Sequence, residues 1–187
     1  MDAYKSVDWG RLRNLYIHDK QLENCKVVSS RKKILEVLPK NGICAELGVE
    51  HGIFSNKILD INKPKKLVLV DIMLQKHLQV EHDVVEPIKG DSVEVMNQFE
   101  DNYFDWIYID TDHSEEQTNK ELQICKNKIK HDGYLALHDY IRVYDNNYKF
   151  GVIESVNNFL IENEDFEVVY LSLEPHMFNT IVLRRKQ

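Results

Sequence analysis

The sequence lacks the features that mark membrane proteins and secreted proteins. None of its apolar runs approaches the ~20 residues needed to cross a bilayer, and the segment Met1–Lys5 contains no apolar signal region. The three cysteines are an odd number without C-x-x-C spacing, which fits a reducing compartment and inert thiols. We therefore expect a cytoplasmic protein with no membrane partner.

Positive charge is also scarce. Lys and Arg total 24 residues against 31 Asp and Glu, for a formal net charge of −7. Because binding to a nucleic-acid backbone depends on a positive face that releases counterions, this balance argues against nucleic acid as a partner. The basic clusters Arg31–Lys33 and Arg184–Lys186 are expected to be a solvated helix face and a solvated tail.

Linkers and repeats are absent as well. With 7 Gly and 4 Pro, no stretch is rich in Gly, Ser or Pro, and no internal repeat or low-complexity segment is found. A chain of 187 residues, 43% hydrophobic and 29% charged, is typical of one globular domain with its own core. We expect a single domain over residues 1–187, with a lead-in over 1–41 and a core over 42–187.

Helix and strand patterns alternate along the core. The lead-in is expected to be helical, because its apolar residues recur at helical spacing, at Trp9, Leu12, Leu15, Tyr16, Ile34, Leu35 and Leu38. The expected strands are Ile43–Leu47, Lys66–Asp71, Val84–Lys89, Phe104–Asp110, Tyr134–His138, Phe166–Leu173 and Thr180–Arg184. The expected helices between them are Ile53–Leu59, Ser92–Asn97, Glu115–Lys128 and Gly151–Glu162. This alternation predicts a three-layer α/β fold with a Rossmann-like, mostly parallel sheet of seven strands.

The last two expected strands break the parallel pattern. Only Glu174–Asn179 separates Phe166–Leu173 from Thr180–Arg184, and this loop is too short for a crossover helix. The two strands should therefore form an antiparallel hairpin. A mostly parallel sheet that ends in such a hairpin is the arrangement of class I methyltransferases.

A loop with two glycines joins the first core strand to the first core helix. Gly48 permits a positive φ or a close backbone approach, and Gly52 lets the helix pack against the strand. Asp71 follows Gly52 by 19 positions and ends the apolar run that starts at Leu67. At this distance its carboxylate is placed to accept hydrogen bonds from ribose hydroxyls, so the pattern predicts a nucleoside pocket.

The charge of this loop discriminates between nucleoside ligands. Glu46 and Glu50 are acidic, and no Lys or Arg lies between Gly42 and Asn56. Carboxylates there would repel the pyrophosphate of a dinucleotide. S-adenosylmethionine has no phosphate and carries a positive sulfonium, so we expect it to be the cofactor.

A second polar group follows two later strands. Asp110, Asp112 and His113 follow one strand, and His138 and Asp139 follow the next. Functional residues of open α/β sheets gather beyond the carboxyl ends of strands, so these side chains should meet. Neighbouring carboxylates repel unless a cation lies among them, and this donor set suits Mg²⁺ or a softer ion. The alternative is structural: the aspartates cap the following helix and His138 is a core histidine.

These strand-end motifs carry a family resemblance. Residues 104–114 and 130–140 pair D-x-D-H with G-x-x-x-x-H-D-Y, and Gly151–Phe159 is similar to the helix after the fifth strand of the family. Over about residues 42–160 the chain resembles the metal-dependent class I methyltransferases related to macrocin O-methyltransferase, the mycinamicin methyltransferases and the cephalosporin hydroxylase group. The resemblance implies an O-methyltransferase that uses S-adenosylmethionine.

The resemblance also implies roles for the second polar group. Asp110, His138 and Asp139 would hold a divalent metal, expected to be Mg²⁺, and His113 would be the general base beside Asp110. Some relatives have a carboxylate at the position of His138, so the identity of the metal stays open. With an ordinary pKa of ~6.5, a histidine base would be mostly neutral near pH 7.

The resemblance further implies which residues surround the cofactor. These are Glu46, Gly48, Gly52, Ser55, Asp71, Ile72, Met73, Asp91 and Asp110. Ser55 would lie near the methionine carboxylate, Ile72 and Met73 against the adenine ring, and Asp91 near the adenine amine. Alternatively, Asp91 is the N-cap of the helix that follows it, and Ile72 and Met73 belong to the core.

The acceptor is expected to be a small molecule. Its pocket should come from the lead-in and from the loops Arg142–Phe150 and Glu174–Asn179, which lie outside the shared core. Tyr144, Asp145, Asn146, Asn147 and Tyr148 offer aromatic and hydrogen-bonding groups that suit a sugar. A homo-oligomer is possible. Two rival interpretations stay open, a non-catalytic binding or partner subunit with this sheet and a nucleotide-dependent oxidoreductase.

Overall fold

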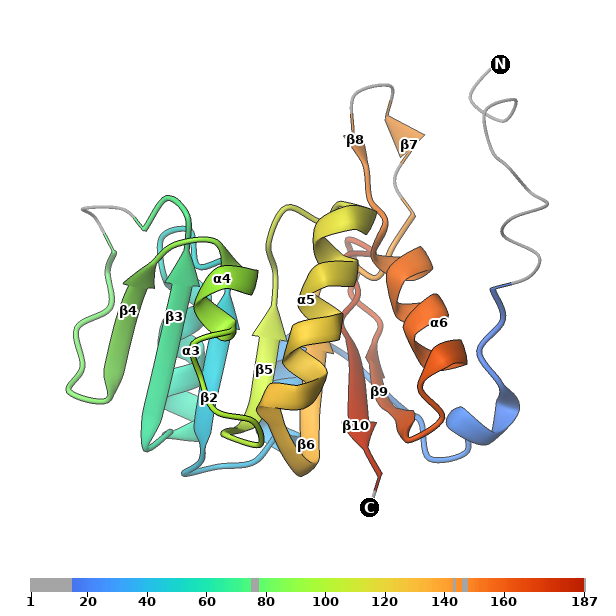
Figure 1. Cartoon of the computed structure of the whole chain (residues 1–187), viewed down its shortest axis with the longest axis horizontal. Coiled ribbons are helices and arrows are strands. Elements are labelled where there is room, and N and C mark those ends of the chain that lie inside the picture. The colour runs from blue at the N-terminus through green and yellow to red at the C-terminus, as the bar shows by residue number, and fades with distance from the viewer. Residues whose placement is uncertain (1–14, 75–77, 143, 146–147, 187) are drawn as a thin grey trace.

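An eight-stranded sheet forms the centre of the computed structural model, which describes residues 15–74, 78–142, 144–145 and 148–186 (Figure 1). The strand order is β1-β9-β10-β6-β5-β2-β3-β4, and β10 runs antiparallel to both of its neighbours. The other adjacent pairs are parallel. The strands are β1 (Lys26–Val28), β2 (Ile43–Leu47), β3 (Lys66–Asp71), β4 (Val85–Lys89), β5 (Phe104–Ile109), β6 (Ile129–Leu137), β9 (Phe166–Ser172) and β10 (Ile181–Arg185).

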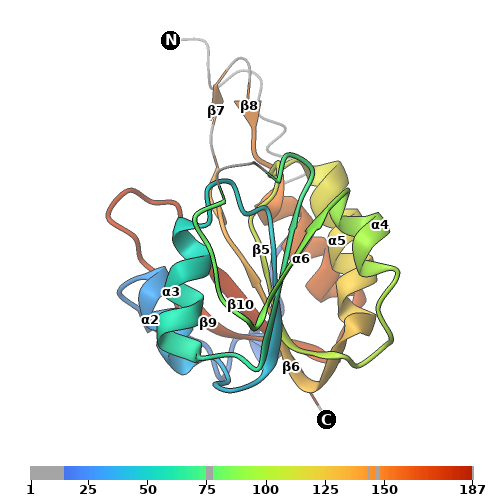
Figure 2. The same ribbon diagram turned by 90° about the vertical axis from the view of Figure 1, so that its left-hand side faces the viewer.

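Helices cover both faces of this sheet (Figure 2). On one face lie α2 (Arg31–Val37) and α3 (Ile53–Asn62), and on the other lie α4 (Ser92–Met96), α5 (Glu115–Lys128) and α6 (Val152–Glu162). A short 3-10 helix, η2 (Asp19–Gln21), precedes β1. The predicted three-layer arrangement is therefore confirmed. No helix in the described part of the chain has the length and apolar character that a membrane span requires.

Alternate side chains of the strands enter two separate hydrophobic clusters. In β2, Ala45 and Leu47 pack with residues of α4, α5 and α6, whereas Cys44 packs with residues of α2 and α3. In β3, Val68 and Leu69 divide between the clusters in the same way. Because both faces are covered, these strands are apolar along their whole length, as is typical of parallel sheets.

Most predicted elements agree with the structure to within a few residues. β2, β3 and α5 have the predicted bounds, and β9 and β10 form the predicted antiparallel hairpin. The α3 helix extends three residues beyond its expected end, Leu59, to Asn62. The fold of the core therefore follows from local pattern and loop length.

The lead-in differs from the helical segment that was expected. It contributes β1, which pairs parallel to β9 and adds an eighth strand at the edge of the sheet. Three residues are too few for a periodic pattern to mark a strand. The α2 helix does form, with Ser30 as its N-cap accepting from the Lys33 amide, while Trp9 and Leu12 lie outside the described residues.

A small hairpin stands above the carboxyl ends of the strands, between β6 and α6 (Figure 1). It consists of β7 (Tyr144–Asp145) and β8 (Tyr148–Lys149), paired antiparallel. This segment lies within the loop Arg142–Phe150, whose expected contact with the acceptor stays a prediction. Asn146 and Asn147 lie outside the described residues, and for β7 and β8 the structure describes only the backbone.

Candidate functional site

The loop Glu46–Gly52, called the glycine loop below, follows β2. Gly48 and Gly52 have φ values of 83° and 80°, a region that residues with a Cβ rarely adopt. A Cβ on Gly48 would clash with the backbone oxygen of Asp110, and one on Gly52 would clash with the Val80 side chain. Both glycines thus allow parts of the protein itself to approach closely, and Gly48 brings the glycine loop against the end of β5.

Asp71 holds the glycine loop in place. Its Oδ2 accepts hydrogen bonds from the amides of Val49 (2.8 Å) and Glu50 (3.0 Å), and its Oδ1 accepts from the Met73 amide (2.7 Å). The ribose contact expected of Asp71 stays a prediction. Ile72 and Met73 are 64% and 63% exposed, so they are not core residues. They offer an apolar surface beside this end of β3.

Glu46 is buried under the glycine loop. The Ser55 hydroxyl donates a hydrogen bond to its carboxylate. Burial raises the pKa of Glu46 to about 8, against the opposing effect of the Ser55 hydrogen bond. Near neutral pH Glu46 therefore carries a proton for most of the time, and less negative charge faces a ligand than the sequence indicates.

Asp91 caps the helix that follows it. Its Oδ1 accepts hydrogen bonds from the amides of Val93 (2.9 Å) and Glu94 (3.1 Å) at the start of α4. The alternative expected from the sequence, an N-cap, is therefore present. The contact of Asp91 with an adenine amine stays a prediction.

The ends of β5 and β6 bring together Asp110, His113 and Asp139, called the acidic cluster below. His113 Nε2 lies 2.7 Å from Asp139 Oδ2 and 3.3 Å from Asp110 Oδ1. One ligand atom from each residue lies within 4.8 Å of the others, which is compact enough for one metal ion. His113 and Asp139 have φ values of 61° and 56°, and such strained backbone is concentrated at functional sites.

The two carboxylates of the acidic cluster change the protonation of His113. Burial by itself would lower its pKa, but the hydrogen bonds and charges of Asp110 and Asp139 outweigh burial and raise the pKa to about 9. The expectation of a mostly neutral histidine near pH 7 is therefore wrong for the metal-free protein. The imidazolium supplies the positive charge that the two carboxylates need.

His138 lies outside the acidic cluster, although it was expected to be a metal ligand together with Asp110 and Asp139. Its Nδ1 lies 2.9 Å from Oγ1 of Thr180, the residue before β10, and its Nε2 lies 3.5 Å from Asp139 Oδ1. Burial lowers its pKa, so the ring is neutral. These contacts fit the structural alternative, a core histidine, and His113 is the histidine that meets the two carboxylates.

Arg31 reaches this site from the lead-in. Its Nη1 lies 3.6 Å from Asp110 Oδ2, and its guanidinium lies 4.7 Å from the centre of the Phe54 ring. Its backbone amide donates to the Glu174 carboxylate. From the sequence, Arg31 was expected on a solvated face with Lys32 and Lys33. That expectation is wrong for Arg31, because α2 packs beside α3 and β9 and directs this side chain toward Asp110 and Phe54.

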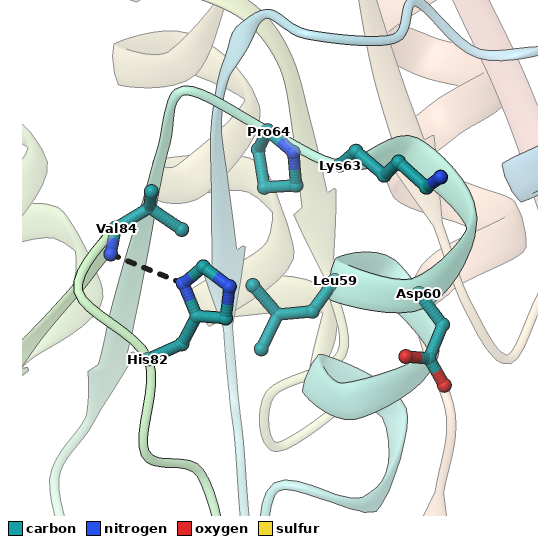
Figure 3. Close-up of a pocket in the computed structure, with 6 residues that line it drawn as sticks. All are labelled: Leu59, Asp60, Lys63, Pro64, His82 and Val84. Atoms are coloured by element: carbon teal, nitrogen blue, oxygen red, sulfur yellow. Dashed lines mark hydrogen bonds between the residues drawn. The ribbon is translucent and has the colours of Figure 1, made fainter.

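A hollow lies at the amino-terminal ends of β3 and β4 (Figure 3). It has a volume of about 350 Å³ and is lined by Leu59, Asp60, Lys63, Pro64, His82 and Val84. Inside it the Val84 amide donates to His82 Nδ1 at 3.3 Å. None of the predicted site residues lines this hollow. It is therefore separate from the candidate site at the carboxyl ends of the strands.

Comparison with known families decides the broad class of the protein. A family model described as a methyltransferase domain matches residues 45–140, which include both the glycine loop and the acidic cluster. The chain belongs to this methyltransferase family. No curated protein matches the chain well enough to count as a relative.

Solved structures show the same fold. A spermidine synthase from Thermotoga maritima is 18% identical, with a TM-score of 0.59 over 85% of this chain and 58% of that enzyme. The Burkholderia thailandensis 1,6-didemethyltoxoflavin-N1-methyltransferase, with S-adenosylhomocysteine bound, is 13% identical, with a TM-score of 0.61 over 83% of this chain and 76% of that one. The MycE methyltransferase, in complex with Mg, S-adenosylhomocysteine and mycinamycin VI, is 15% identical, with a TM-score of 0.60 over 84% and 48%. The match thus spans about half of MycE and under two thirds of the spermidine synthase.

Proposed function

We propose that this protein transfers the methyl group of S-adenosylmethionine to a hydroxyl oxygen of a small molecule. The observation that carries the proposal is the juxtaposition of the glycine loop with the acidic cluster. At Gly48 the loop lies directly against the backbone of Asp110. A nucleoside cofactor on the loop would therefore present its reactive end to groups that can accept a proton.

The chemistry of the glycine loop supports S-adenosylmethionine. The glycine loop contains no Lys or Arg that could bind a phosphate. The nearby carboxylates of Asp71 and Asp110 favour a positively charged sulfonium. Ile72 and Met73 offer exposed apolar surface for an adenine ring. Arg31, a third of whose side chain is exposed, has the charge to pair with the methionine carboxylate. The Burkholderia and MycE structures, which contain S-adenosylhomocysteine, support the same choice.

Two carboxylates of the acidic cluster fit a divalent metal. Asp110 and Asp139 would supply oxygen ligands, which suit Mg²⁺ or Mn²⁺, and His113 would stay outside the ligand set so that its nitrogen can act as the base. When bound, such an ion would lower the pKa of an acceptor hydroxyl and, by neutralising the carboxylates, the pKa of His113. The Mg²⁺ in the MycE complex supports this part of the proposal.

The proposed reaction assigns a task to each group. The acceptor oxygen forms a bond to the methyl carbon as the sulfur–methyl bond breaks, and sulfur keeps the electron pair. The hydroxyl proton passes to His113 Nε2, provided that this nitrogen is neutral. The imidazolium that forms donates its new N–H to the carboxylates of Asp139 and Asp110, which lie 2.7 Å and 3.3 Å from Nε2. The protein thus contributes mainly alignment and a proton acceptor.

Calorimetric titration with S-adenosylhomocysteine tests the cofactor. We expect binding, and we expect the same titration with NADH to show none. Repeating it with Mg²⁺ and with a chelator tests the metal, since Mg²⁺ should lower the pKa of His113 measured by NMR. Absence of S-adenosylhomocysteine binding would overturn the proposed function, whereas an unchanged His113 pKa would remove only the metal.

Once an acceptor is known, the variant His113→Gln tests the base. It should keep affinity for S-adenosylhomocysteine within about twofold and reduce turnover by roughly 10²–10⁴-fold, the usual contribution of general base catalysis. His131→Gln changes an exposed histidine far from the site and is the matched control. A large loss of cofactor affinity in His113→Gln would place His113 on the cofactor side of the sulfonium.

A further inference from the structure

Four aromatic rings form a row that starts at the acidic cluster. The His113 ring centre lies 4.7 Å from that of Phe150, which lies 6.2 Å from Phe178, and Phe178 lies 5.6 Å from His176. These residues, called the ring row below, come from three separate segments: the β5–α5 loop, the chain after β8, and the β9–β10 loop. The fold therefore assembles this row, and no single stretch of sequence contains it.

The outer part of the ring row is open to solvent. Phe178 is 36% exposed and the neighbouring Met177 is 65% exposed. Figure 2 shows the β9–β10 loop projecting from the sheet, at the end of the molecule where the β7–β8 hairpin also stands. Contiguous exposed apolar side chains that lead to a polar cluster are typical of a ligand site.

The cation that the structure describes on the segment before the β7–β8 hairpin is paired. Arg142 Nη1 lies 3.1 Å from Glu154 Oε1. The Glu174 carboxylate, on the same loop as Phe178, accepts from the Arg31 amide. With Arg142 paired and carboxylates close by, the described surroundings of the ring row disfavour an anionic ligand.

We propose that the ring row is the acceptor subsite, and that the acceptor carries an uncharged ring with an apolar face. This inference rests on the proposed function. The apolar face stacks on Phe150 and Phe178, and a hydroxyl on the edge of the ring points to the acidic cluster. Both a pyranose, through its C–H face, and a phenol have this chemistry. The row thus selects a ring, and the cluster selects its hydroxyl.

Saturation-transfer NMR on the whole protein with S-adenosylhomocysteine tests this subsite. The probes are phenol, methyl β-D-glucopyranoside and glycerol, which has hydroxyls but no ring. At least one ring probe should bind and glycerol should not. Binding of phenol alone identifies an aromatic acceptor, and binding of the pyranoside alone identifies a sugar. Equal signals from glycerol and both ring probes overturn the proposal.

The variant Phe178→Ala tests the residues themselves. Loss of one stacking partner should weaken the ring probe that binds by about three- to tenfold, and Phe178→Tyr should restore the affinity. Val27→Ala, which shortens an exposed side chain on the edge strand β1, is the matched control. Equal probe affinities of Phe178→Ala and wild type overturn the subsite. In that case, intact binding of S-adenosylhomocysteine to the wild type shows that the proposed function itself still stands.

Discussion

The glycine loop and the acidic cluster lie side by side, but their charges are neutralised in different ways. Asp71 beside the loop is held by three backbone amides within 3.0 Å. The carboxylates of Asp110 and Asp139 instead face cationic side chains, which are protonated His113 for both and Arg31 for Asp110. Backbone dipoles are part of the fold, whereas an imidazolium can lose its proton or be displaced.

This difference separates a preformed site from an adjustable one. Backbone hydrogen bonds to Asp71 hold the glycine loop in its conformation. Cofactor binding should therefore require little rearrangement of the loop. In the acidic cluster, a cation and the His113 proton compete for the same two carboxylates. We therefore expect ligand binding at the glycine loop to depend weakly on pH, and metal binding at the acidic cluster to strengthen as pH rises.

The largest effect is expected from a substitution that removes the ion pair between Asp139 and His113 in the acidic cluster. In Asp139→Asn the pKa of His113 should fall from about 9 toward its ordinary value, because the imidazolium loses its shortest contact, 2.7 Å. A fall of about 2 units is a ~100-fold change in proton affinity. NMR titration of the His113 ring measures it. Asp112→Asn, which changes a carboxylate outside the acidic cluster, should leave the pKa within about 0.5 units, and a fall as large as that of Asp139→Asn would show that the pair is not its cause.

The next largest effect is expected from a substitution of Asp71, whose carboxylate supports the glycine loop. Asp71→Asn removes the charge that holds the amides of Val49, Glu50 and Met73. Charge-assisted hydrogen bonds contribute ~1.5–3 kcal/mol each, so affinity for S-adenosylhomocysteine should fall by roughly 10–100-fold. Calorimetry measures this change. Asp60→Asn, on the exposed side of α3, is the control, and equal affinities in both variants would mean that the loop does not need Asp71.

Arg31 connects the two regions, and its role can be isolated with two ligands. Arg31→Gln should weaken S-adenosylhomocysteine by about tenfold, as expected for loss of a charge-assisted pair. It should leave the affinity for 5′-methylthioadenosine unchanged, because that ligand has no methionine carboxylate. Lys32→Gln, on the exposed side of α2, is the matched control. If both ligands weaken equally, Arg31 supports the site through Asp110 and does not contact the carboxylate.

Buried carboxylates make the stability of the protein depend on pH. Burial raises the pKa of Glu121 to about 7, against hydrogen bonds from Ser92, Thr111 and Gln117. The folded state thus holds this proton more tightly than the unfolded state does. The resulting stability is present below pH ~4.3 and is lost as pH rises through about 7.

The variant Glu121→Gln tests this dependence. Between pH 5 and 8 the free energy of unfolding should fall by ~1–3 kcal/mol more in the wild type than in the variant. Urea unfolding at both pH values measures the difference. Glu116→Gln, on the exposed face of the same helix, should behave like the wild type. Parallel pH profiles of the wild type and Glu121→Gln would contradict the prediction.

The smallest expected effect concerns the apolar surface beside the glycine loop. Ile72→Ala should weaken S-adenosylhomocysteine by about three- to tenfold through lost contact with the adenine ring. Thermal stability should change little, because Ile72 is largely exposed. Val37→Ala removes another exposed apolar side chain, at the end of α2. The same affinity in both variants would move the adenine away from Ile72.

Much of the fold could be predicted because its signals are local. The bounds of β2, β3 and α5 follow from periodicity and caps, and the β9–β10 hairpin follows from a loop too short for a helix. The strand β1 could not be predicted in this way. Its three residues pair with β9, which lies more than 140 positions later in the chain, and such a short segment has no pattern of its own.

The residues of the candidate site likewise fall into two groups, those that the sequence could identify and those that it could not. Gly48, Gly52 and Asp71 could be identified because their spacing follows from one strand, one turn and the next strand. His113 and His138 could not be ranked, since each directly adjoins the motif aspartates in the sequence. Only the direction of each ring decides that His113 Nε2 meets both carboxylates, whereas His138 contacts Thr180 and lies 3.5 Å from Asp139 alone.

The sequence by itself determined a mostly parallel sheet, a glycine loop after its first core strand, and acidic residues at two later strand ends. These features depend on alternation, helical spacing and the conformational freedom of glycine, which act over a few residues. The tertiary structure alone decided the approach of Arg31 to Asp110, the protonation of Glu46 and His113, and the assembly of the ring row. The reason is physical: burial and Coulomb interactions depend on distances between segments, which no local pattern specifies.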